Sequence, residues 1–316
     1  MQPSVSSLRV LGADCGGTKT LGILADGEGR LLARRQVGPG NPNVVGPETA
    51  ARNLVDLLTG CCKDAACSIG DLSAVVLGLA GVGAPAIRDS LLDALRGELA
   101  RRDSRLPPVV IESDARIALE GAFGGRPGAI LIAGTGSIVL GKLPEGTIVR
   151  AGGWGRTLGD EGSGYFLGRE ALRAVAQEID SSGSAGALRK LLAERHGWTS
   201  REQIIVAVYQ HRFDLPSLAP LVLQAAESGD EVSRSILSRG AKDLAAQVAA
   251  VVRQIRTEGS VDVAFVGGLI DHDNIYTDIL KQAIRRAAPS VRVRAAELPP
   301  AQGAVLLALH HARSSG

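Results

Sequence analysis

Two glycine-bearing turns of the chain have the residue types that bind phosphate groups. The first has the sequence Asp14-Cys15-Gly16-Gly17-Thr18-Lys19-Thr20. Paired glycines let the backbone approach an anion and offer it N–H groups, while a hydroxyl and an ammonium add a donor and a positive charge. The residues predicted to contact phosphate are Gly16, Gly17, Thr18 and Lys19. Asp14 could hold Mg²⁺ through water, although a plain glycine hairpin explains this segment equally well on its own.

The second turn comes about 120 residues later, with the sequence Ala133-Gly134-Thr135-Gly136-Ser137. Its predicted phosphate contacts are Gly134, Thr135, Gly136 and Ser137. The first turn matches neither a P-loop nor a dinucleotide-binding fingerprint, because the spacing differs and a strand pattern follows it. If the two halves of the chain are related by a pseudo-twofold axis, the two turns face each other. A pair of such turns indicates a phosphate-binding site more specifically than either turn alone.

The segment Gly152–Gly164 (GGWGRTLGDEGSG) has the highest density of glycine in the chain. Packing alone does not require so many glycines beside a tryptophan and two acids. We therefore predict a loop that approaches a ligand and opens a helix from Ser163 onward. A lone tryptophan is more often a core residue, but its glycine-rich setting makes Trp154 a candidate for ligand contact.

Asp114 is the candidate catalytic residue, because it follows the buried apolar run Val109–Ile111. Ligands of open α/β sheets bind beyond the carboxyl ends of strands, and a carboxylate there can accept the proton of an attacking hydroxyl. Asp114 could instead cap the helix that begins at Ala115.

A second strand pattern, Val261–Val266, ends in Gly267 and Gly268. A flat base or a ribose could lie against this pair, although a simple strand-to-helix turn explains it equally well. Asp271, His272 and Asp273 follow, and we favour a solvated loop over a metal cluster there. The chain contains neither the nucleophile elbow of serine hydrolases nor the zinc-protease helix motif.

Alternating strands and helices must position these residues. Apolar patterns predict strands at Arg9–Ala13, Thr20–Ala25, Leu31–Val37, Ala74–Leu79 and Val109–Ile111, with helices from Pro47, over Pro85–Arg102 and from Ala115 to Phe123. The order restarts with strands at Ala129–Ala133, Ile138–Gly141 and Thr147–Ala151, followed by a helical stretch from Glu161 to about Thr257. Two further strands are predicted at Val261–Val266 and Val291–Arg294, and two further helices at Asn274–Ala287 and Ala301–Ala312. This duplicated β-β-β-α-β-α-β unit predicts an α/β protein of two similar lobes with a cleft between them.

The length, composition and charge of the chain exclude several classes of protein. The 316 residues are enough for about two domains, and they include 40 glycines but only 3% aromatic residues. The net charge of +2 is too balanced for a protein dedicated to nucleic acid or membrane surfaces. No apolar run approaches the ~18 residues of a membrane span, no signal-peptide pattern is present, and four cysteines without metal-ligand spacing fit a reducing compartment. We therefore expect a cytoplasmic protein with a small-molecule ligand.

Four motifs together resemble the N-acetylglucosamine kinase and BadF-type ATPase family, in the actin-like sugar-kinase superfamily. They are D-x-G-G-T-K-T at Asp14–Thr20, S-D-A at Ser113–Ala115, I-A-G-T-G-S at Ile132–Ser137 and G-G-W-G-x-x-x-G-D-E-G-S at Gly152–Ser163. The resemblance runs from about Val10 to the last helix. It implies two RNase H-like lobes that close over ATP and a sugar, an N-terminal lobe of residues 1–119 with residues 299–316 packing back on it, and a C-terminal lobe of residues 120–298.

The resemblance also implies roles for individual residues. Asp114 matches the catalytic base for the sugar hydroxyl, and Thr18 and Thr135 match contacts to ATP phosphates. The positions that match contacts to the amino sugar are Asn41, Gly153, Trp154 and Asp160. Asn41 lies in Gly40-Asn41-Pro42-Asn43, which its residues alone predict to be a rigid polar turn.

Two departures from the family pattern concern the ligand sites. Cys15 stands where a glycine or another small residue is common, which we expect to change little. Pro42 and Asn43 replace an aromatic residue of the animal members, which affects the expected fit of the sugar's acyl group. Because every cysteine precedes residue 68, we expect no iron–sulfur cluster of the kind that BadF-type reductase activators carry.

The expected activity is therefore ATP- and Mg²⁺-dependent phosphorylation of N-acetylglucosamine at its 6-hydroxyl, by a homodimer. Glucosamine and N-acetylmuramic acid are alternative substrates. A BadF-type ATPase that acts on a partner protein is an alternative of another class. A sugar-binding regulator is less favoured, because that class normally has an N-terminal helix-turn-helix and only eight residues precede the first strand.

Overall fold

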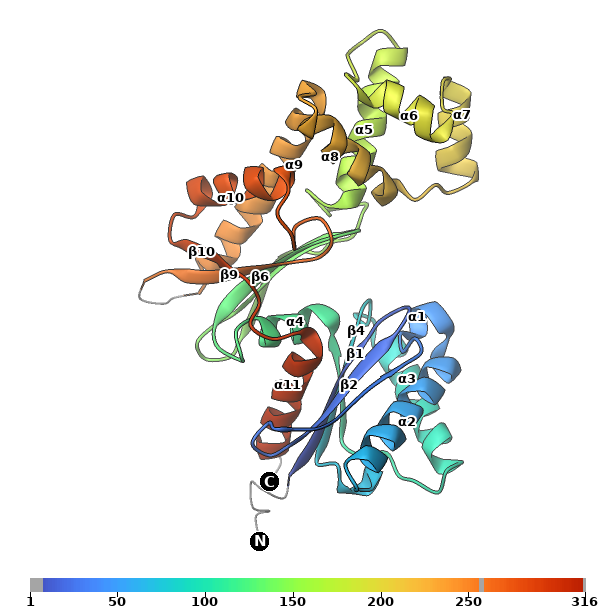
Figure 1. Ribbon diagram of the computed structural model, residues 1–316, viewed down its shortest axis with the longest axis vertical. Coiled ribbons are helices and arrows are strands. Elements are labelled where there is room, and N and C mark those ends of the chain that lie inside the picture. Colours follow the sequence, from blue (N-terminus) through green and yellow to red (C-terminus); the bar gives the residue numbers. More distant parts are fainter. Residues whose placement is uncertain (1–7, 256–258, 315–316) are drawn as a thin grey trace. The chain divides into compact units, whose positions relative to one another are not determined.

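The computed structural model describes residues 8–255 and 259–314, which form two compact units (Figure 1). Unit 1 comprises residues 1–126 and 296–316, and unit 2 comprises residues 127–295. The boundary expected between residues 119 and 120 falls inside a helix, and the structure keeps that helix whole in unit 1. No helix within the described ranges is long and apolar enough to cross a membrane.

Unit 1 is built on a five-stranded sheet with the strand order β3-β2-β1-β4-β5. Its strands are β1 (Arg9–Cys15), β2 (Thr20–Asp26), β3 (Leu31–Val37), β4 (Ala74–Leu79) and β5 (Val109–Ser113). Its helices are α1 (Pro42–Val45), α2 (Pro47–Asp64), α3 (Pro85–Ala100), α4 (Asp114–Ala122) and α11 (Pro300–Ser314). β1, β2 and β3 pair antiparallel, whereas β4 runs parallel to both β1 and β5.

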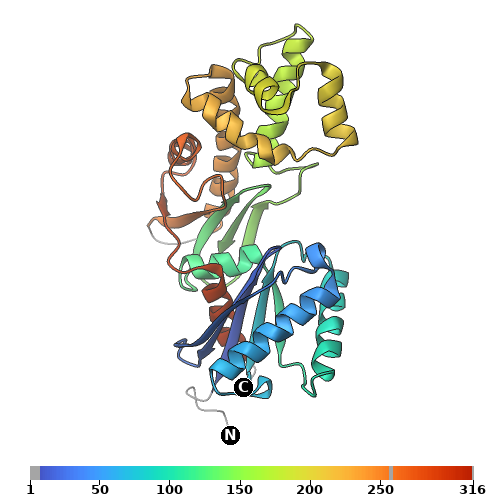
Figure 2. The same ribbon diagram turned by 45° about the vertical axis from the view of Figure 1, so that its right-hand side comes forward.

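Helices cover both faces of this sheet (Figure 2). Successive side chains of a strand point to opposite faces, so Leu11 packs in the core beneath α2 and α3, while its neighbour Val10 packs against α11. Cys61 and Cys62 of α2 are buried free thiols that pack in the first of these cores.

Unit 2 contains a second five-stranded sheet, with the order β10-β9-β6-β7-β8. Its strands are β6 (Gly128–Ala133), β7 (Ser137–Lys142), β8 (Ile148–Gly152), β9 (Val261–Val266) and β10 (Val291–Arg294). Its helices are α5 (Gly164–Ile179), α6 (Leu188–His196), α7 (Arg201–Ile205), α8 (Ala219–Glu227), α9 (Glu231–Val252) and α10 (Ile275–Ala287). Read from β8 to β10, the strands repeat the order and the directions of unit 1, which confirms the predicted duplication.

Polar side chains cap the helices of the long helical stretch. Ser163 caps α5, which confirms the helix start predicted there. Ser200 and Gln203 form a capping box at α7, and Asp230 caps α9. A π-helical turn, Val206–Gln210, follows α7 and was not expected. The end predicted at about Thr257 lies outside the described residues.

The prediction of a plain turn around Asn41 is wrong, because the chain forms the short helix α1 there. Pro42 occupies the first helical position, where its missing N–H costs nothing and its φ is already suitable. The Asn41 side chain accepts a hydrogen bond from the Asn43 amide at 2.9 Å and so caps the helix. A four-residue helix has too few residues to produce an apolar period in the sequence.

Candidate functional site

In unit 1, the predicted residues gather at the carboxyl ends of parallel strands. Asp14 lies near the end of β1, and Asp114 follows β5, with β4 between the two strands. Burial, and after it the negative charge of Asp114, raise the pKa of the half-buried Asp14 carboxyl, while Lys19 lowers it. The electrostatic influence of Asp114 on Asp14 places both carboxylates in one neighbourhood.

Asp114 is exposed at the first turn of α4, and it is not the cap of that helix. The Ser113 hydroxyl is the cap, since it accepts a hydrogen bond from the Arg116 amide at 3.0 Å. One Asp114 carboxylate oxygen accepts a hydrogen bond from the Ala115 amide at 2.8 Å. The other oxygen has no hydrogen-bond donor within the described ranges, so Asp114 can accept a proton or a hydrogen bond from a ligand.

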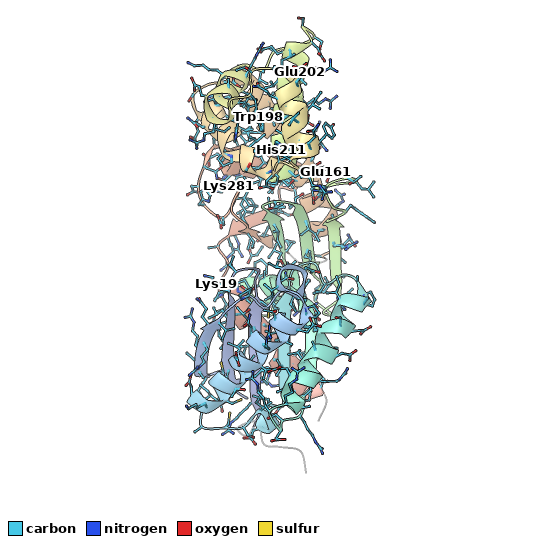
Figure 3. The ribbon with its side chains drawn as sticks, turned by 90° about the vertical axis from the view of Figure 1, so that its right-hand side faces the viewer. Lys19, Glu161, Trp198, Glu202, His211 and Lys281 are labelled. Carbon is cyan, nitrogen blue, oxygen red and sulfur yellow. The ribbon has the colours of Figure 1, made fainter. Side chains whose placement is uncertain are left out.

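The turn between β1 and β2 needs one of its two glycines for its own geometry. The Gly16 amide donates to the Lys19 carbonyl at 2.9 Å, and a Cβ on Gly16 would lie 2.8 Å from that carbonyl oxygen. A Cβ on Gly17 would meet only the side chain of Val44, at 3.2 Å. Thr18 and Lys19 are exposed, and Lys19 projects from the turn (Figure 3). The turn therefore presents a hydroxyl and an ammonium to solvent.

Asn41 lies beside these residues, but its amide already makes hydrogen bonds to the backbone. Its side chain is 5% exposed, and its amide nitrogen donates to the Ala80 carbonyl at 3.2 Å, just beyond β4. Asn43 is exposed and donates to the same carbonyl at 3.2 Å. Asn41 therefore connects α1 to the end of β4. Its amide oxygen can accept one more hydrogen bond and its amide nitrogen can donate one more, so both atoms can still bind a ligand.

In unit 2, the turn between β6 and β7 is joined to Asp160 and to the start of α5. The Ser137 amide donates to Asp160 Oδ1 at 3.1 Å, and a Cβ on Gly136 would lie 2.8 Å from the same oxygen. The Gly134 carbonyl accepts from the Gly164 amide at 2.7 Å. Asp160 has a φ of 60°, a left-handed conformation uncommon outside glycine. These contacts hold Asp160 and the start of α5 against the turn.

The pair of glycines after β9 packs against the same turn. Gly267 has a φ of 101°, and a Cβ on it would lie 2.6 Å from the Ala133 carbonyl oxygen, so the turn itself requires glycine there. Gly268 is exposed, and a Cβ on it would meet nothing within 4 Å. A strand-to-helix turn explains Gly267, whereas the open space around Gly268 is available to a ligand.

Trp154 is a surface residue, so the alternative that it belongs to the core is wrong. Its side chain is 65% exposed, and the Arg150 guanidinium carbon lies 5.5 Å from its ring centroid. Gly153 has a φ of 70° and donates its amide to the Ser137 carbonyl at 3.1 Å. The glycine-rich loop therefore holds the tryptophan outside the core, directly after Gly153, which is hydrogen-bonded to the turn that carries Ser137.

Glu161 and Gln247 hold this loop in place, and the sequence reading missed both. The Glu161 carbonyl accepts from the Ser137 hydroxyl at 2.7 Å, and its carboxylate accepts from the Gln247 amide nitrogen at 2.9 Å (Glu161 is labelled in Figure 3). A Cβ on Gly152 would lie 2.4 Å from Gln247 Oε1. Gln247 lies in the C-terminal half of α9 and is partly buried, and nothing in the local pattern distinguishes it from the other polar residues of that helix.

A cavity of about 750 Å³ in unit 2 brings Thr135 and Asp160 together. Arg156, Tyr165 and Arg212 also line it. Arg156 lies in the glycine-rich loop and could have been selected there as a charged residue. Arg212 lies in the helical stretch, more than fifty residues from Asp160, so only the fold reveals that they share a cavity.

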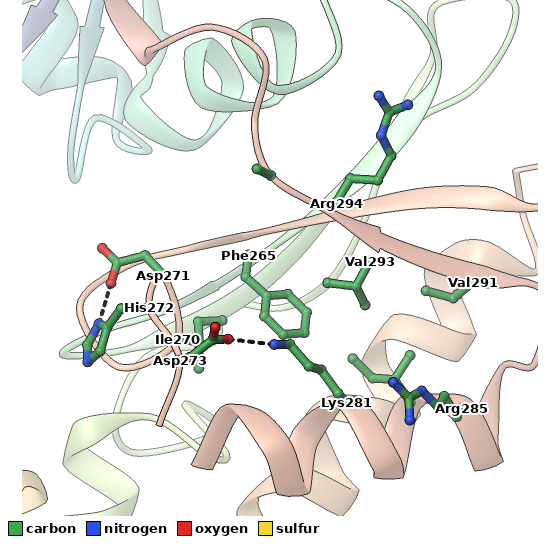
Figure 4. Close-up of a pocket in the computed structure, with 12 residues that line it drawn as sticks. Phe265, Ile270, Asp271, His272, Asp273, Lys281, Arg285, Val291, Val293 and Arg294 are labelled. Atoms are coloured by element: carbon green, nitrogen blue, oxygen red, sulfur yellow. Dashed lines mark hydrogen bonds and ion pairs between the residues drawn. The ribbon is translucent and has the colours of Figure 1, made fainter. Parts of the chain in front are cut away.

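The loop at Asp271–Asp273 has the character of a solvated loop. His272 Nδ1 lies 2.8 Å from Asp271 Oδ1, and Asp273 pairs with Lys281 at 2.8 Å, beside a pocket that Phe265 also lines (Figure 4). Within the described part of the chain, no group of three or more histidine, cysteine or acidic residues could hold a metal ion. A cation at Asp14 would therefore need water and ligand oxygens to complete its coordination.

Comparisons with known proteins agree with this arrangement. The model of the BadF/BadG/BcrA/BcrD ATPase family matches residues 11–308. The N-acetylmuramic acid/N-acetylglucosamine kinase of Clostridium acetobutylicum is 31% identical over 303 residues, which cover 95% of this chain and 97% of that protein. The N-acetyl-D-glucosamine kinase of Dictyostelium discoideum is 31% identical over 319 residues, with the same two coverages.

A solved structure from Chromobacterium violaceum, described as a proposed N-acetylglucosamine kinase, superimposes with a TM-score of 0.69 at 27% identity. The match covers 96% of this chain and 99% of that one. A glucokinase of the ROK family from Streptomyces griseus matches with a TM-score of 0.53 at 21% identity, which shows a shared fold.

Proposed function

Because the chain belongs to the BadF/BadG/BcrA/BcrD ATPase family, we propose that it is an ATP-dependent amino-sugar kinase whose substrate is N-acetylglucosamine, phosphorylated at the 6-hydroxyl. Two relatives that it matches over 95% of its length are named as kinases of this sugar. The structural observation that carries the proposal is the cavity of unit 2, where Thr135 and Asp160 lie together. These are the residues that match an ATP contact and a sugar contact of the family.

Asp114 acts as the general base in this proposal. As the sugar O6 attacks, its proton passes to the Asp114 carboxylate, the bond from O6 to the γ-phosphorus forms, and the bond from that phosphorus to the bridging oxygen of ADP breaks. Such a step needs positioning and charge neutralisation more than covalent catalysis. The exposed Asp114 oxygen has no donor within the described residues and is available for the proton.

The other predicted residues bind and orient the substrates. Gly16, Gly17, Thr18 and Lys19 contact ATP phosphates from unit 1, and Gly134, Thr135, Gly136 and Ser137 contact them from unit 2. Gly267 and Gly268 contact the adenosine, through the open space at Gly268. Asn41, Gly153, Trp154 and Asp160 contact the sugar, with the exposed Trp154 ring offering an apolar face to the pyranose.

Asp14 fits a magnesium ligand. Its carboxyl is half-buried, and burial, followed by the negative charge of Asp114, raises its pKa, so a divalent cation bound there would stabilise the ionised carboxylate. Mg²⁺ is commonly bound through one or two carboxylates together with substrate phosphates and water. Bound there, the ion would neutralise charge on the transferring phosphate.

The proposal is tested by measuring ADP release with ATP and N-acetylglucosamine, glucosamine, N-acetylmuramic acid or glucose, each in turn. We expect N-acetylglucosamine to have the highest kcat/KM and product analysis to place the phosphate on O6. A preference for glucosamine or N-acetylmuramic acid would keep the kinase and change its substrate. ADP release that no sugar stimulates would contradict the proposal and favour a BadF-type ATPase that acts on a partner protein.

The homodimer and the cytoplasmic location that the sequence led us to expect stay predictions. Light scattering on the purified protein would give the mass of the assembly, and fractionation of the producing cell would give its location.

A further inference from the structure

Two arginines from distant segments line the same cavity of unit 2 as Thr135 and Asp160. Arg156 belongs to the glycine-rich loop, between Trp154 and Asp160. Arg212 follows the π-helical turn Val206–Gln210, in the part of the chain that precedes α8. The fold therefore adds two positive charges to a cavity that already holds a predicted phosphate contact.

Both guanidinium groups are available to a ligand. Neither Arg156 nor Arg212 has a hydrogen bond or ion pair with any residue in the described ranges. Two carboxylates, Asp160 and Asp214, line the cavity as well, but neither lies within ion-pair distance of these arginines. Unpaired arginines also occur on the outer surface of the protein, but Arg156 and Arg212 line one cavity together.

The backbone at Arg212 supports a functional role. Its φ is 49°, a left-handed conformation that a residue with a long side chain rarely adopts. The π-helical turn that precedes it is a second local irregularity, and both kinds of irregularity concentrate at functional sites. The π-helical turn and the left-handed residue interrupt the regular helix at this point, and the chain brings Arg212 to the cavity there.

We infer that Arg156 and Arg212 form an anion-binding pair, which recognises a phosphate or carboxylate group of a substrate that enters this cavity. A guanidinium binds either group through two parallel hydrogen bonds. This inference rests on the proposed function, in which the substrate ATP carries a polyphosphate; N-acetylmuramic acid, the alternative sugar substrate, carries a carboxylate. Thr135 in the same cavity favours the polyphosphate.

The test uses the full chain with the variants Arg156→Gln, Arg212→Gln and Arg212→Lys. Arg286→Gln removes one positive charge from the exposed surface of α10 and is the matched control. Dissociation constants for ATP and ADP are measured without sugar, and the KM for each amino sugar is measured at saturating ATP. Circular dichroism and thermal melting show that each variant is folded.

If the pair binds the polyphosphate, each glutamine variant weakens ATP binding by about tenfold or more, as expected for loss of a charge-assisted hydrogen bond. Arg212→Lys retains part of the affinity, because the charge remains while the two-bond geometry is lost. If the pair binds the sugar carboxylate, ATP binding is unchanged and the KM for N-acetylmuramic acid alone rises. Either result supports the inference and identifies the anion.

The inference is overturned if the folded glutamine variants match Arg286→Gln in nucleotide binding and in the KM for every amino sugar measured. This failure is distinct from failure of the proposed function. ATP binding is read without turnover, so a protein that phosphorylates no amino sugar would still reveal whether the arginines hold the nucleotide.

Discussion

Asp114 and Asp14 have different surroundings, although Asp14 lies near the end of one strand and Asp114 directly follows another strand of the same sheet. Asp114 is exposed, with one oxygen free of donors in the described part of the chain, whereas Asp14 is half-buried and its pKa is raised. The exposed carboxylate suits proton transfer with a substrate that arrives from solvent, and the half-buried one suits a cation. Ser113 is the helix cap, so Asp114 uses only one of its oxygens for the first turn of α4, in the bond from the Ala115 amide.

Replacing Asp114 by asparagine is expected to abolish most turnover and to leave nucleotide binding intact. The amide has nearly the same shape but cannot accept the proton, and general-base catalysis is typically worth ~10²–10⁴-fold in rate. The measurements are kcat with N-acetylglucosamine and the dissociation constant of ATP. The variant Asp114→Ala should behave in the same way. Turnover close to that of the unmodified protein in either variant would remove Asp114 from the mechanism.

Packed glycines decide how the helices of unit 1 approach each other. A Cβ on Gly303 of α11 would lie 1.9 Å from the Ile117 carbonyl oxygen of α4, a backbone atom that cannot move aside. Gly97 of α3 is exposed, and a Cβ there would meet nothing within 4 Å. Both lie inside helices, so the same substitution has opposite consequences at the two positions.

Gly303→Ala is expected to lower the free energy of unfolding by about 1–3 kcal/mol or more, because α11 must move away from α4. Gly97→Ala is expected to raise it by about 0.5–1 kcal/mol, since alanine favours the helix and restricts the unfolded chain. Urea denaturation of the two variants measures both changes. If Gly303→Ala left the free energy of unfolding unchanged, the packing of α4 against α11 would have to be looser than in the structure.

The strand β10 at the edge of the unit 2 sheet is held by an acid that bonds two arginines. Asp262 accepts hydrogen bonds from Arg292 at 2.6 Å and from Arg294 at 2.7 Å. The bond from Arg292 is the main reason that the pKa of Asp262 lies below its ordinary value. The ionised carboxylate therefore stabilises the folded state above the unfolded pKa of about 3.9, and this contribution is lost as the pH falls through the lower folded pKa.

Asp262→Asn should lower the melting temperature at pH 7, by an amount equivalent to about 0.5–1 kcal/mol, since both arginines are partly exposed to solvent. The difference from the unmodified protein should shrink as the pH falls from about 4 through the lower folded pKa of Asp262, below which both proteins carry a neutral side chain. Asp93→Asn removes a well-exposed pair with Arg96 and is the control, with almost no effect expected. A difference for Asp262→Asn that stayed constant down to pH 2 would contradict the ionic explanation.

At the scale of the whole molecule, the duplicated fold places a glycine turn after the first strand of each sheet. The turn after β1 belongs to unit 1 and the turn after β6 belongs to unit 2. The proposed kinase draws on both units, because Asp114 lies in the first and Thr135 and Asp160 lie in the second. Binding of the two substrates must therefore affect both units.

Hydrogen exchange followed by mass spectrometry is expected to show this. A non-hydrolysable ATP analogue with N-acetylglucosamine should slow exchange in peptides that contain residues 14–20 and 113–116, and in peptides that contain residues 134–137 and 159–165. The physical reason is that bound ligand occupies or orders these backbone amides. Protection confined to one unit would show that the residues of the other unit do not contact the substrates.

The sequence by itself determined the duplicated order of strands and helices and the residues of the two glycine turns. Apolar periods and glycine positions are local signals, and they remain readable because each strand or helix is long enough to show a repeat. The same local chemistry identified Asp114 at the end of a strand, and the tertiary structure then showed that Ser113 is the helix cap.

Only the tertiary structure decided which residues of distant segments share a cavity. Arg212 joins Thr135 and Asp160 through the packing of the helical segments of unit 2, and Gln247 joins Glu161 and Gly152 through the packing of α9. Side chains in these positions carry no local signal, because their neighbours along the chain differ from their neighbours in space. The hydrogen bond from the Asn41 amide to the Ala80 carbonyl, just beyond β4, escaped prediction for the same reason. The helix α1 itself was missed because four residues are too few to show an apolar period.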